Sequence, residues 1–299
     1  FEEAQPLNNV YINIRNSNSI LPARIQPEQQ LSWDGSYIIR IPSFKARLTG
    51  YATQIKHSSE KSYFFTQSRL GDESAGFLTQ TMLDAEKLHF GMELGAEYDL
   101  TASWKASAVV SLNQYTYTNN PLLFQSSDKY LISNPIVSYL KDYHSGQAPE
   151  HVYSLGIEYQ SPRYWWVALT ANYFDKNYIG IAPSLRTENI YLDPNSGSRY
   201  TDIDEGTVRH LLRQEQLPSI FLLNATAGKS WRIKGNFLNV FVSVNNLLNT
   251  QYKSNGFEQA RKGDYKAMIK EQKSGYPTFG NKYFTGYGTS FYLNVALSL

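Results

Sequence analysis

Apolar and polar residues alternate with a period of two along the segment 85–117. One face carries Leu88, Phe90, Met92, Leu94, Ala96 and Tyr98 before a polar turn, and Trp104, Ala106, Ala108, Val110 and Leu112 after it. Because successive side chains of a strand point to opposite faces, this pattern predicts a two-faced β-hairpin that turns at 99–102. The strands exceed the usual length of about 5 to 6 residues. They also reach the length of about 9 to 11 residues with which a tilted strand crosses a bilayer.

The same alternation recurs along the rest of the chain. Further strands are expected at 29–41, 44–55, 153–159, 165–174, 219–229, 237–246 and 289–299. Long loops are expected at 1–27, 56–82, 118–150, 176–218 and 247–286. The strand 29–41 is expected to be interrupted at Asp34 and Gly35. A short helix is predicted within 207–216, with Val208, Leu211 and Leu212 on one side.

The connections alternate between short turns and long loops. About nine long strands arise in this way, and bacterial outer-membrane barrels show this asymmetry, with their short turns on the periplasmic side. Aromatic residues lie where the apolar bands end: Tyr98, Trp104 and Trp231 near short turns, and Tyr115 and Tyr117 at the far end. The pattern predicts an all-β protein, an antiparallel transmembrane β-barrel.

The composition agrees with a barrel. The mean hydropathy of −0.44 is low, as expected when half of each strand faces a polar interior. The sequence contains no run of 18 apolar residues that would predict a transmembrane helix. A net charge of +2 gives no indication of nucleic acid as a partner. The chain begins without a signal peptide, so for an exported protein we expect the true N-terminus to be missing.

A soluble alternative competes with the barrel. Amphipathic antiparallel strands usually form half-buried sheets of soluble proteins, and exposed Trp and Tyr on a sandwich could bind glycans. The strand length, the aromatic residues at both edges of the apolar band and the asymmetry of the loops favour the barrel instead.

Several short motifs carry a family resemblance. They are Val242–Tyr252 (with the run Asn-Asn-Leu-Leu-Asn), Gly256-Phe-Glu-Gln259 with Arg261, Leu48-Thr-Gly-Tyr51, Tyr159–Trp166 and Ser184-Leu-Arg-Thr187. In their order and spacing they resemble TonB-dependent receptors. That resemblance implies a plug domain followed by a 22-stranded barrel. Residues 1–299 would then be the C-terminal part of such a barrel, about its last nine strands, with the N-terminal plug and the first strands absent from this chain. The absent part is expected either from the rest of the same polypeptide or from a separate chain. The last residue, Leu299, departs from the Phe on which many such barrels end.

The resemblance implies a receptor and transporter in the cell outer membrane, crossing it many times. Such receptors import iron chelates, vitamin B12, oligosaccharides or peptides with energy transmitted by TonB, here through the missing N-terminal part. Membrane lipid, lipopolysaccharide and a surface lipoprotein are further expected partners. The alternative is a barrel that transports nothing and serves as one subunit of an envelope or assembly complex.

The sequence shows no convincing catalytic or cofactor site. The five His have no metal-ligand spacing, and there is no Cys. Residues 193–204 resemble a calcium loop but lack Gly at the sixth position and Glu at the twelfth, so a solvated acidic loop is the favoured interpretation. No enzyme activity, cofactor or metal is therefore predicted.

Ligand-binding candidates are polar and aromatic residues of the barrel interior and of the outer loops. The interior candidates are Lys87, His89, Asn113, Tyr115, Asn172, Phe174, Asn224 and Asn245, and the loop candidates are Arg186 and Arg213, with Arg209 beside them. The alternative for each is that it fills the interior, holds loops together or contacts the plug. Glu93, Gly95 and Glu97 are expected to contact the plug. Asn245, Asn246 and the motif 256–259 match the family and are expected to organise loops.

Overall fold

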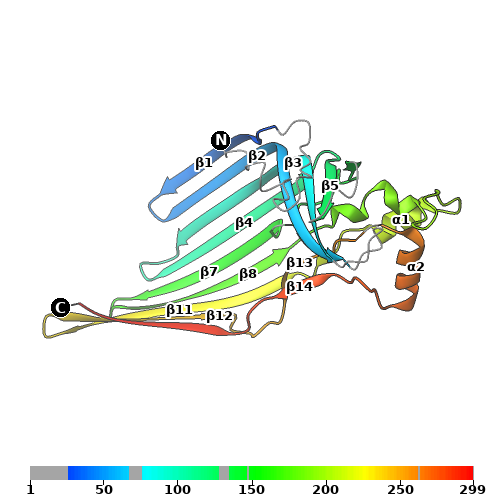
Figure 1. The fold of residues 1–299 in the computed structure, drawn as a ribbon. Helices are drawn as coiled ribbons and strands as arrows, with labels where there is room; N and C mark the ends of the chain where they lie inside the picture. The colour runs from blue at the N-terminus through cyan, green and yellow to red at the C-terminus, as the bar shows by residue number, and fades with distance from the viewer. Residues whose placement is uncertain (1–25, 67–75, 128–134, 147, 262, 299) are drawn as a thin grey trace.

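A computed structural model describes residues 26–66, 76–127, 135–146, 148–261 and 263–298. Nine long strands form one curved antiparallel sheet in the order β1-β2-β3-β4-β7-β8-β11-β12-β15 (Figure 1). Their bounds are β1 Gln29–Ile41, β2 Phe44–Thr66, β3 Gly76–Asp99, β4 Trp104–Tyr117, β7 His151–Ser161, β8 Trp165–Asp175, β11 Ile220–Ile233, β12 Asn236–Asn245 and β15 Ser290–Ser298. Among the described residues β1 and β15 each pair on one side alone, so the sheet is a barrel wall that is not closed.

The other elements gather at the end of the sheet where the long connections lie, opposite the tight turns (Figure 1). The short strands are β5 Leu122–Ser127, β6 Ile136–Val137, β9 Asn177–Tyr178, β10 Gln216–Leu217, β13 Lys253–Phe257 and β14 Lys282–Thr285. The helices are α1 Glu205–Leu211 and α2 Tyr265–Ser274, with 3-10 turns η2 Pro183–Leu185 and η3 Glu188–Tyr191. We call this end the loop end and the other the turn end.

The two faces of the sheet differ as the alternation predicts. Apolar side chains of one face are left uncovered along the whole sheet, with Leu155 65% and Leu293 59% exposed. The other face carries polar side chains that bond one another, such as the Tyr51 hydroxyl donating to Asn113 Oδ1 at 2.8 Å. An uncovered apolar face of this extent is expected of a sheet whose solvent is lipid. Over the described residues, no helix is long and apolar enough to cross a membrane.

Aromatic rings form a row at the turn end of the apolar face. The rings of Trp104 and Tyr159 lie 4.9 Å apart, and those of Tyr159 and Trp165 lie 5.0 Å apart. Trp231 follows on β11 and is 40% exposed. The sequence places Trp231 in a turn, but the strand continues through Ile233 and turns at Lys234 and Gly235, both with positive φ.

Two predictions about the first strands are wrong. Strand β1 is not interrupted at Asp34 and Gly35, because these residues pair in unbroken register with Tyr51 and Gly50 of β2. The predicted loop 56–82 is mostly strand, since β2 extends to Thr66 and β3 begins at Gly76. This stretch lacks the apolar alternation that a lipid-facing strand shows, and the ladder of backbone hydrogen bonds forms without it. Residues 1–25, expected as loop, lie outside the described residues.

The loop segments hold more structure than the sequence pattern predicts. The predicted helix at 207–216 exists as α1, but it begins earlier, at Glu205, and ends earlier, at Leu211. Helix α2 and the pair β13–β14 lie in the expected loop 247–286, and β5 and β6 lie in the expected loop 118–150. In retrospect, Asp264 and Gly275 mark the ends of α2. The Asp264 side chain accepts from the amides of Lys266 and Ala267, and Gly275 ends the helix in the left-handed conformation, φ 70°.

Candidate functional site

The loop end contains its own apolar core, separate from the sheet faces. Six buried residues pack together there: Ala182, Leu185, Ile190, Val208, Tyr265 and Met268. Leu211 and Leu212 pack against this core, which confirms that Val208, Leu211 and Leu212 lie on one side of the helix. Loops from distant parts of the chain are thereby fixed into one body.

A buried ion pair joins two of the family motifs. Arg186 donates from Nη1 to Glu258 Oε2 at 2.5 Å and from Nη2 to Glu258 Oε1 at 2.8 Å. Its guanidinium also donates to the Leu212 carbonyl at 2.9 Å and lies 4.4 Å from the Tyr143 ring. The Glu258 carboxylate accepts in addition from the Ala182 amide at 2.8 Å. Arg186 therefore joins four chain segments, and its charge is balanced by Glu258.

The asparagines of the Asn-Asn-Leu-Leu-Asn run shape the turn that follows β12. Asn246 has φ 52° and Asn249 has φ 51°, the left-handed region that Asn tolerates better than most residues. The side-chain Nδ2 of Asn246 donates to the carbonyls of Thr250 and Tyr287, and its Oδ1 accepts from the backbone amide of Thr250. Asn249 Oδ1 accepts from the Thr289 amide at 3.1 Å. These contacts, with those of Glu258, support the interpretation that the motifs organise loops.

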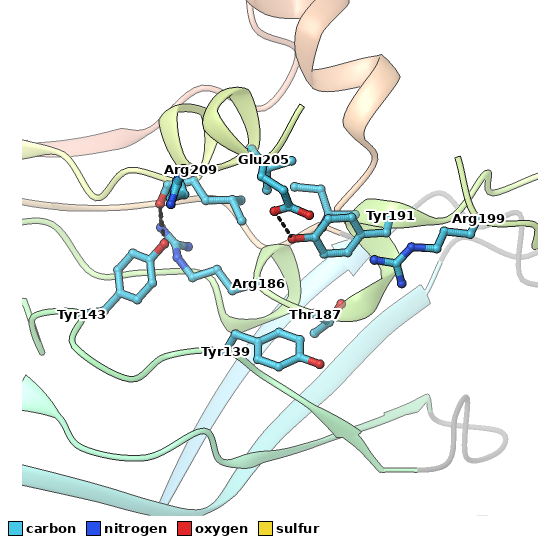
Figure 2. A pocket seen from close by; sticks show the side chains of 11 residues that line it. Tyr139, Tyr143, Arg186, Thr187, Tyr191, Arg199, Glu205 and Arg209 are labelled. Carbon is cyan, nitrogen blue, oxygen red and sulfur yellow. Dashed lines mark hydrogen bonds between the residues drawn. The ribbon is translucent and has the colours of Figure 1, made fainter. Parts of the chain in front are cut away.

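A cavity of about 360 Å³ opens in this loop body (Figure 2). Its lining residues come from the segment before β7 and from the stretch between β8 and β11: Tyr139, Tyr143, Arg186, Thr187, Ile190, Tyr191, Arg199, Glu205, Val208, Arg209 and Leu212. Aromatic faces and guanidinium groups dominate the labelled side chains. Such a lining offers apolar surface for a ligand together with a few polar groups that fix its orientation.

Hydrogen bonds and burial set the positions and the protonation of the polar groups of the cavity. The Tyr191 hydroxyl donates to Glu205 Oε2 at 3.1 Å, and the Arg199 guanidinium lies 4.7 Å from the Tyr191 ring. Burial raises the pKa of Tyr191 and the bond to Glu205 raises it further, so the phenol stays protonated at neutral pH. Burial opposes the charge of Arg186, but the bonds to Glu258 outweigh it and raise the pKa of Arg186 above its usual value.

Four predicted site residues meet on the polar face of β3 and β4. Lys87 is buried and pairs with Glu60, whose carboxylate also accepts from the Tyr117 hydroxyl. His89 packs edge-on against Tyr115, with ring centroids 5.0 Å apart. Asn113 accepts from Tyr51 and is buried over Gly91, where a Cβ atom would overlap its side chain. The structure thus brings together Lys87, His89, Asn113 and Tyr115.

The other predicted site residues are spread over separate strands and loops. Asn172 and Phe174 lie on β8 near the loop end, and Asn224 on β11 accepts from the Asn246 amide at 2.9 Å. Asn245 ends β12, opposite Ser290. Arg213 is exposed just after α1, outside the cavity lining. Ligand binding by these five residues, and by Lys87, His89, Asn113, Tyr115 and Arg186, stays a prediction.

Sequence analysis missed most of the cavity. Of its lining, it named Arg186 and Arg209 as ligand candidates, and Thr187, Val208 and Leu212 only as parts of a motif and of a helix. Tyr139, Tyr191 and Arg199 lie in segments without periodicity, and pattern analysis gives no indication that such segments meet. The one signal was the frequency of Tyr in the expected loops 118–150 and 176–218, and of Arg in the second of them.

The acidic loop 193–204 has no metal-binding arrangement. Asp193 Oδ1 accepts from the Asn195 amide at 2.8 Å, closing a turn, and Asp204 caps α1. In the part of the chain that the structure describes, no group of three His, Asp or Glu side chains could hold a metal ion.

The fold and the loop end define a class of protein. A long-stranded antiparallel sheet with an uncovered apolar face, tight turns at one end and an ordered loop body with a cavity at the other is a portion of an outer-membrane receptor barrel. The family model described as "TonB dependent receptor-like, beta-barrel" matches residues 4–247. The chain belongs to this family, whose members are outer-membrane receptors and transporters.

Two solved structures align with most of this chain, and the likeness to the first of them supports the fold. The copper transporter OprC aligns with a TM-score of 0.53 at 16% identity, over 92% of this chain and 32% of its own. The ferric-catecholate import receptor Fiu from E. coli K12, in its closed form, aligns with a TM-score of 0.49 at 14% identity, over 94% of this chain and 29% of its own. The chain therefore spans about a third of the length of these structures. No curated protein sequence matches it.

Proposed function

We propose that the chain is the C-terminal part of an outer-membrane receptor that imports a scarce nutrient. The family match and the open sheet support this proposal. An open sheet edge in lipid leaves backbone groups unpaired, at several kcal/mol each. We therefore propose that an N-terminal plug and the first strands, from the rest of a longer polypeptide, complete the barrel and pair with the β15 edge.

The observation that carries the proposal is the cavity of the loop body. It lies at the end of the sheet that the long connections define, the outer end in barrels of this kind. We propose that the nutrient first binds there, against Tyr139, Tyr191 and Arg209, and then passes the polar face. Lys87, His89, Asn113 and Tyr115 lie together on that face and are the proposed next contacts.

TonB supplies the energy in this proposal, through the N-terminal part of the receptor. The chain itself performs no covalent chemistry, and its work is to bind, orient and release. Iron chelates, vitamin B12, oligosaccharides and peptides are the proposed ligand classes. Tyr276, just after α2, is 86% exposed at the loop end, and we propose the surface around it as the contact for lipopolysaccharide or a surface lipoprotein.

Uptake measurements test the proposal. Cells that carry the full-length receptor are supplied with one labelled nutrient of each class, with and without a functional TonB. We expect uptake of one class, and its loss without TonB. Arg209→Gln and Tyr139→Ala are expected to reduce uptake, whereas Lys270→Gln, an exposed change on α2, is the matched control. Undiminished uptake without TonB would exclude the energy coupling, and no uptake of any class would favour a structural role in the envelope.

A further inference from the structure

An apolar groove lies at the turn end of the sheet, far from the cavity. Its volume is about 620 Å³, and it is lined by Trp165, Trp166, Val167, Ala227, Gly228, Lys229, Trp231, Val240 and Val242. Register explains its shape. Ala227 lies between Val167 and Val242, and its small side chain leaves a trough between the larger side chains of the two neighbouring strands.

One charge lies in this groove. Lys229 is next along β11 on the same face, between Trp165 and Val240 in register, and its Nζ lies 5.4 Å from the Trp231 ring. A lysine among apolar groups on the outward face is costly in lipid unless its ammonium reaches the interface or an anionic partner.

The turns beside Lys229 add to its positive charge. Arg163 lies in the turn 162–164 between β7 and β8, and Lys234 lies in the turn 234–235 between β11 and β12, with no acidic residue in either. A backbone bond from the Ser230 amide to the Tyr164 carbonyl, 2.9 Å long, holds the first turn against β11. The turn end of the groove therefore carries Lys229 beside Trp165 and Trp231, with one further cation in each of the two adjoining turns.

We propose that this groove is a binding site for one anionic glycerophospholipid of the periplasmic leaflet. An acyl chain lies in the trough over Ala227, and the phosphate meets Lys229 and the cations of the two turns. Trp165 and Trp231 flank the glycerol level, where amphipathic rings are favoured. The inference rests on the proposed membrane function, because short turns mark the periplasmic side only in a barrel.

Lipid binding to the full-length receptor in detergent tests this inference. Native mass spectrometry would measure retained phosphatidylglycerol, with phosphatidylcholine as the neutral comparison. One cation near a membrane surface contributes about 1 kcal/mol, so Lys229→Gln is expected to weaken phosphatidylglycerol binding about fivefold. Lys229→Arg is expected to keep it. Ala227→Leu fills the trough and is expected to abolish retention of that lipid.

Matched controls separate this site from general lipid coating. Lys282→Gln removes a charge at the loop end, and Ala171→Leu adds the same bulk to the apolar face of β8 outside the groove. Both are expected to bind like the unaltered receptor. Equal binding by all variants, equal loss in the controls, or preference for lipopolysaccharide at this site would overturn the inference. If the variants still import the nutrient, the proposed transport function stands whatever the lipid result. If the unaltered receptor imports nothing, the transport function is overturned, and the lipid measurement is judged separately.

Discussion

At the scale of single residues, the packing of the loop end depends on a few polar contacts that are buried from solvent. Arg186 and Glu258 have side chains 1% and 9% exposed and lie 72 residues apart along the chain. Sequence analysis picked Arg186 as a ligand candidate because it is an arginine in an outer loop. Its role in joining the loops through an ion pair could not be predicted, since nothing in the sequence around Arg186 indicates that Glu258 is its neighbour. The motif 256–259, in contrast, was predicted to organise loops, and its contacts support that.

Loss of one partner of this pair is predicted to loosen the loop body. Glu258→Gln leaves a buried guanidinium without its counter-charge, and breaking a buried ion pair costs about 3–5 kcal/mol. Backbone hydrogen exchange of residues 179–187 is the measurement, and protection is expected to fall. The control is Glu188→Gln, which breaks the Arg199–Glu188 pair, whose side chains are 59% and 50% exposed. That pair should contribute about 0–1 kcal/mol. Equal effects of the two variants would contradict this account.

A pH dependence is predicted at Asp204, the N-cap of α1. The Thr207 hydroxyl, and then the Thr207 amide, donate to its carboxylate and lower the pKa of Asp204 below its ordinary 3.8. Because the folded pKa is the lower one, the unfolded state binds more protons as the pH falls. The contribution of the cap is thus complete above pH 3.8 and is lost as the pH falls through the folded value.

Protection factors of the α1 amides, followed from neutral pH into acid, would measure this loss. Asp204→Asn keeps an N-cap oxygen and removes the titration, so its protection should change less with pH. The same acid loss in both proteins would show that another group is responsible.

At the scale of elements, the long strands could be predicted from the sequence because one face of each meets lipid. The structure of the loops could not, because it depends on contacts between residues far apart in the chain. A strand with one face in lipid must alternate, so β3, β4, β7, β8, β11, β12 and β15 follow the sequence pattern. Strand β1 was predicted with a false break, because Gly35 weakens a strand locally while pairing with Gly50 maintains it. Helix α2 was missed because its mostly polar sequence shows little periodicity, and the loop core holds it through Tyr265 and Met268.

The turn after β12 is predicted to depend on the side chain of Asn246. Asn246→Ala loses three side-chain hydrogen bonds, each worth about 0.5–1.5 kcal/mol. It also leaves at φ 52° an alanine, which has no polar side chain to offset the cost of the left-handed conformation. The free energy of unfolding of the receptor in detergent is expected to fall by about 3 kcal/mol. Asn246→Gly keeps the left-handed backbone and should cost less.

Asn195→Ala is the control for this prediction. Asn195 is exposed in the outer loop and contributes its backbone amide to the turn at Asp193, which the substitution leaves in place. No change in unfolding is expected. If Asn246→Ala were equally neutral, the turn would be held by its backbone alone, and the proposed role of the motif would be wrong.

At the scale of the whole molecule, the account requires that the apolar face of the sheet looks outward to lipid and the polar face inward. That orientation is the basis on which three features are interpreted: the asymmetry of the two ends, the aromatic row at the turn end, and the loop body with its cavity. The transport proposal and the lipid site both depend on it.

Single-cysteine accessibility tests this orientation most directly. The chain contains no Cys, so cysteines introduced into it are the sole labelling sites in this region. Spin labels would be placed at Leu155, Leu169 and Leu293 on the apolar face, and at their neighbours Ser154, Ala168 and Asn294, in the full-length receptor in lipid vesicles. We predict that the first set is reached by oxygen dissolved in the bilayer and shielded from a water-soluble nickel chelate. The second set should be shielded from bilayer oxygen. The reverse pattern, with the leucine positions reached by the chelate, would contradict the account.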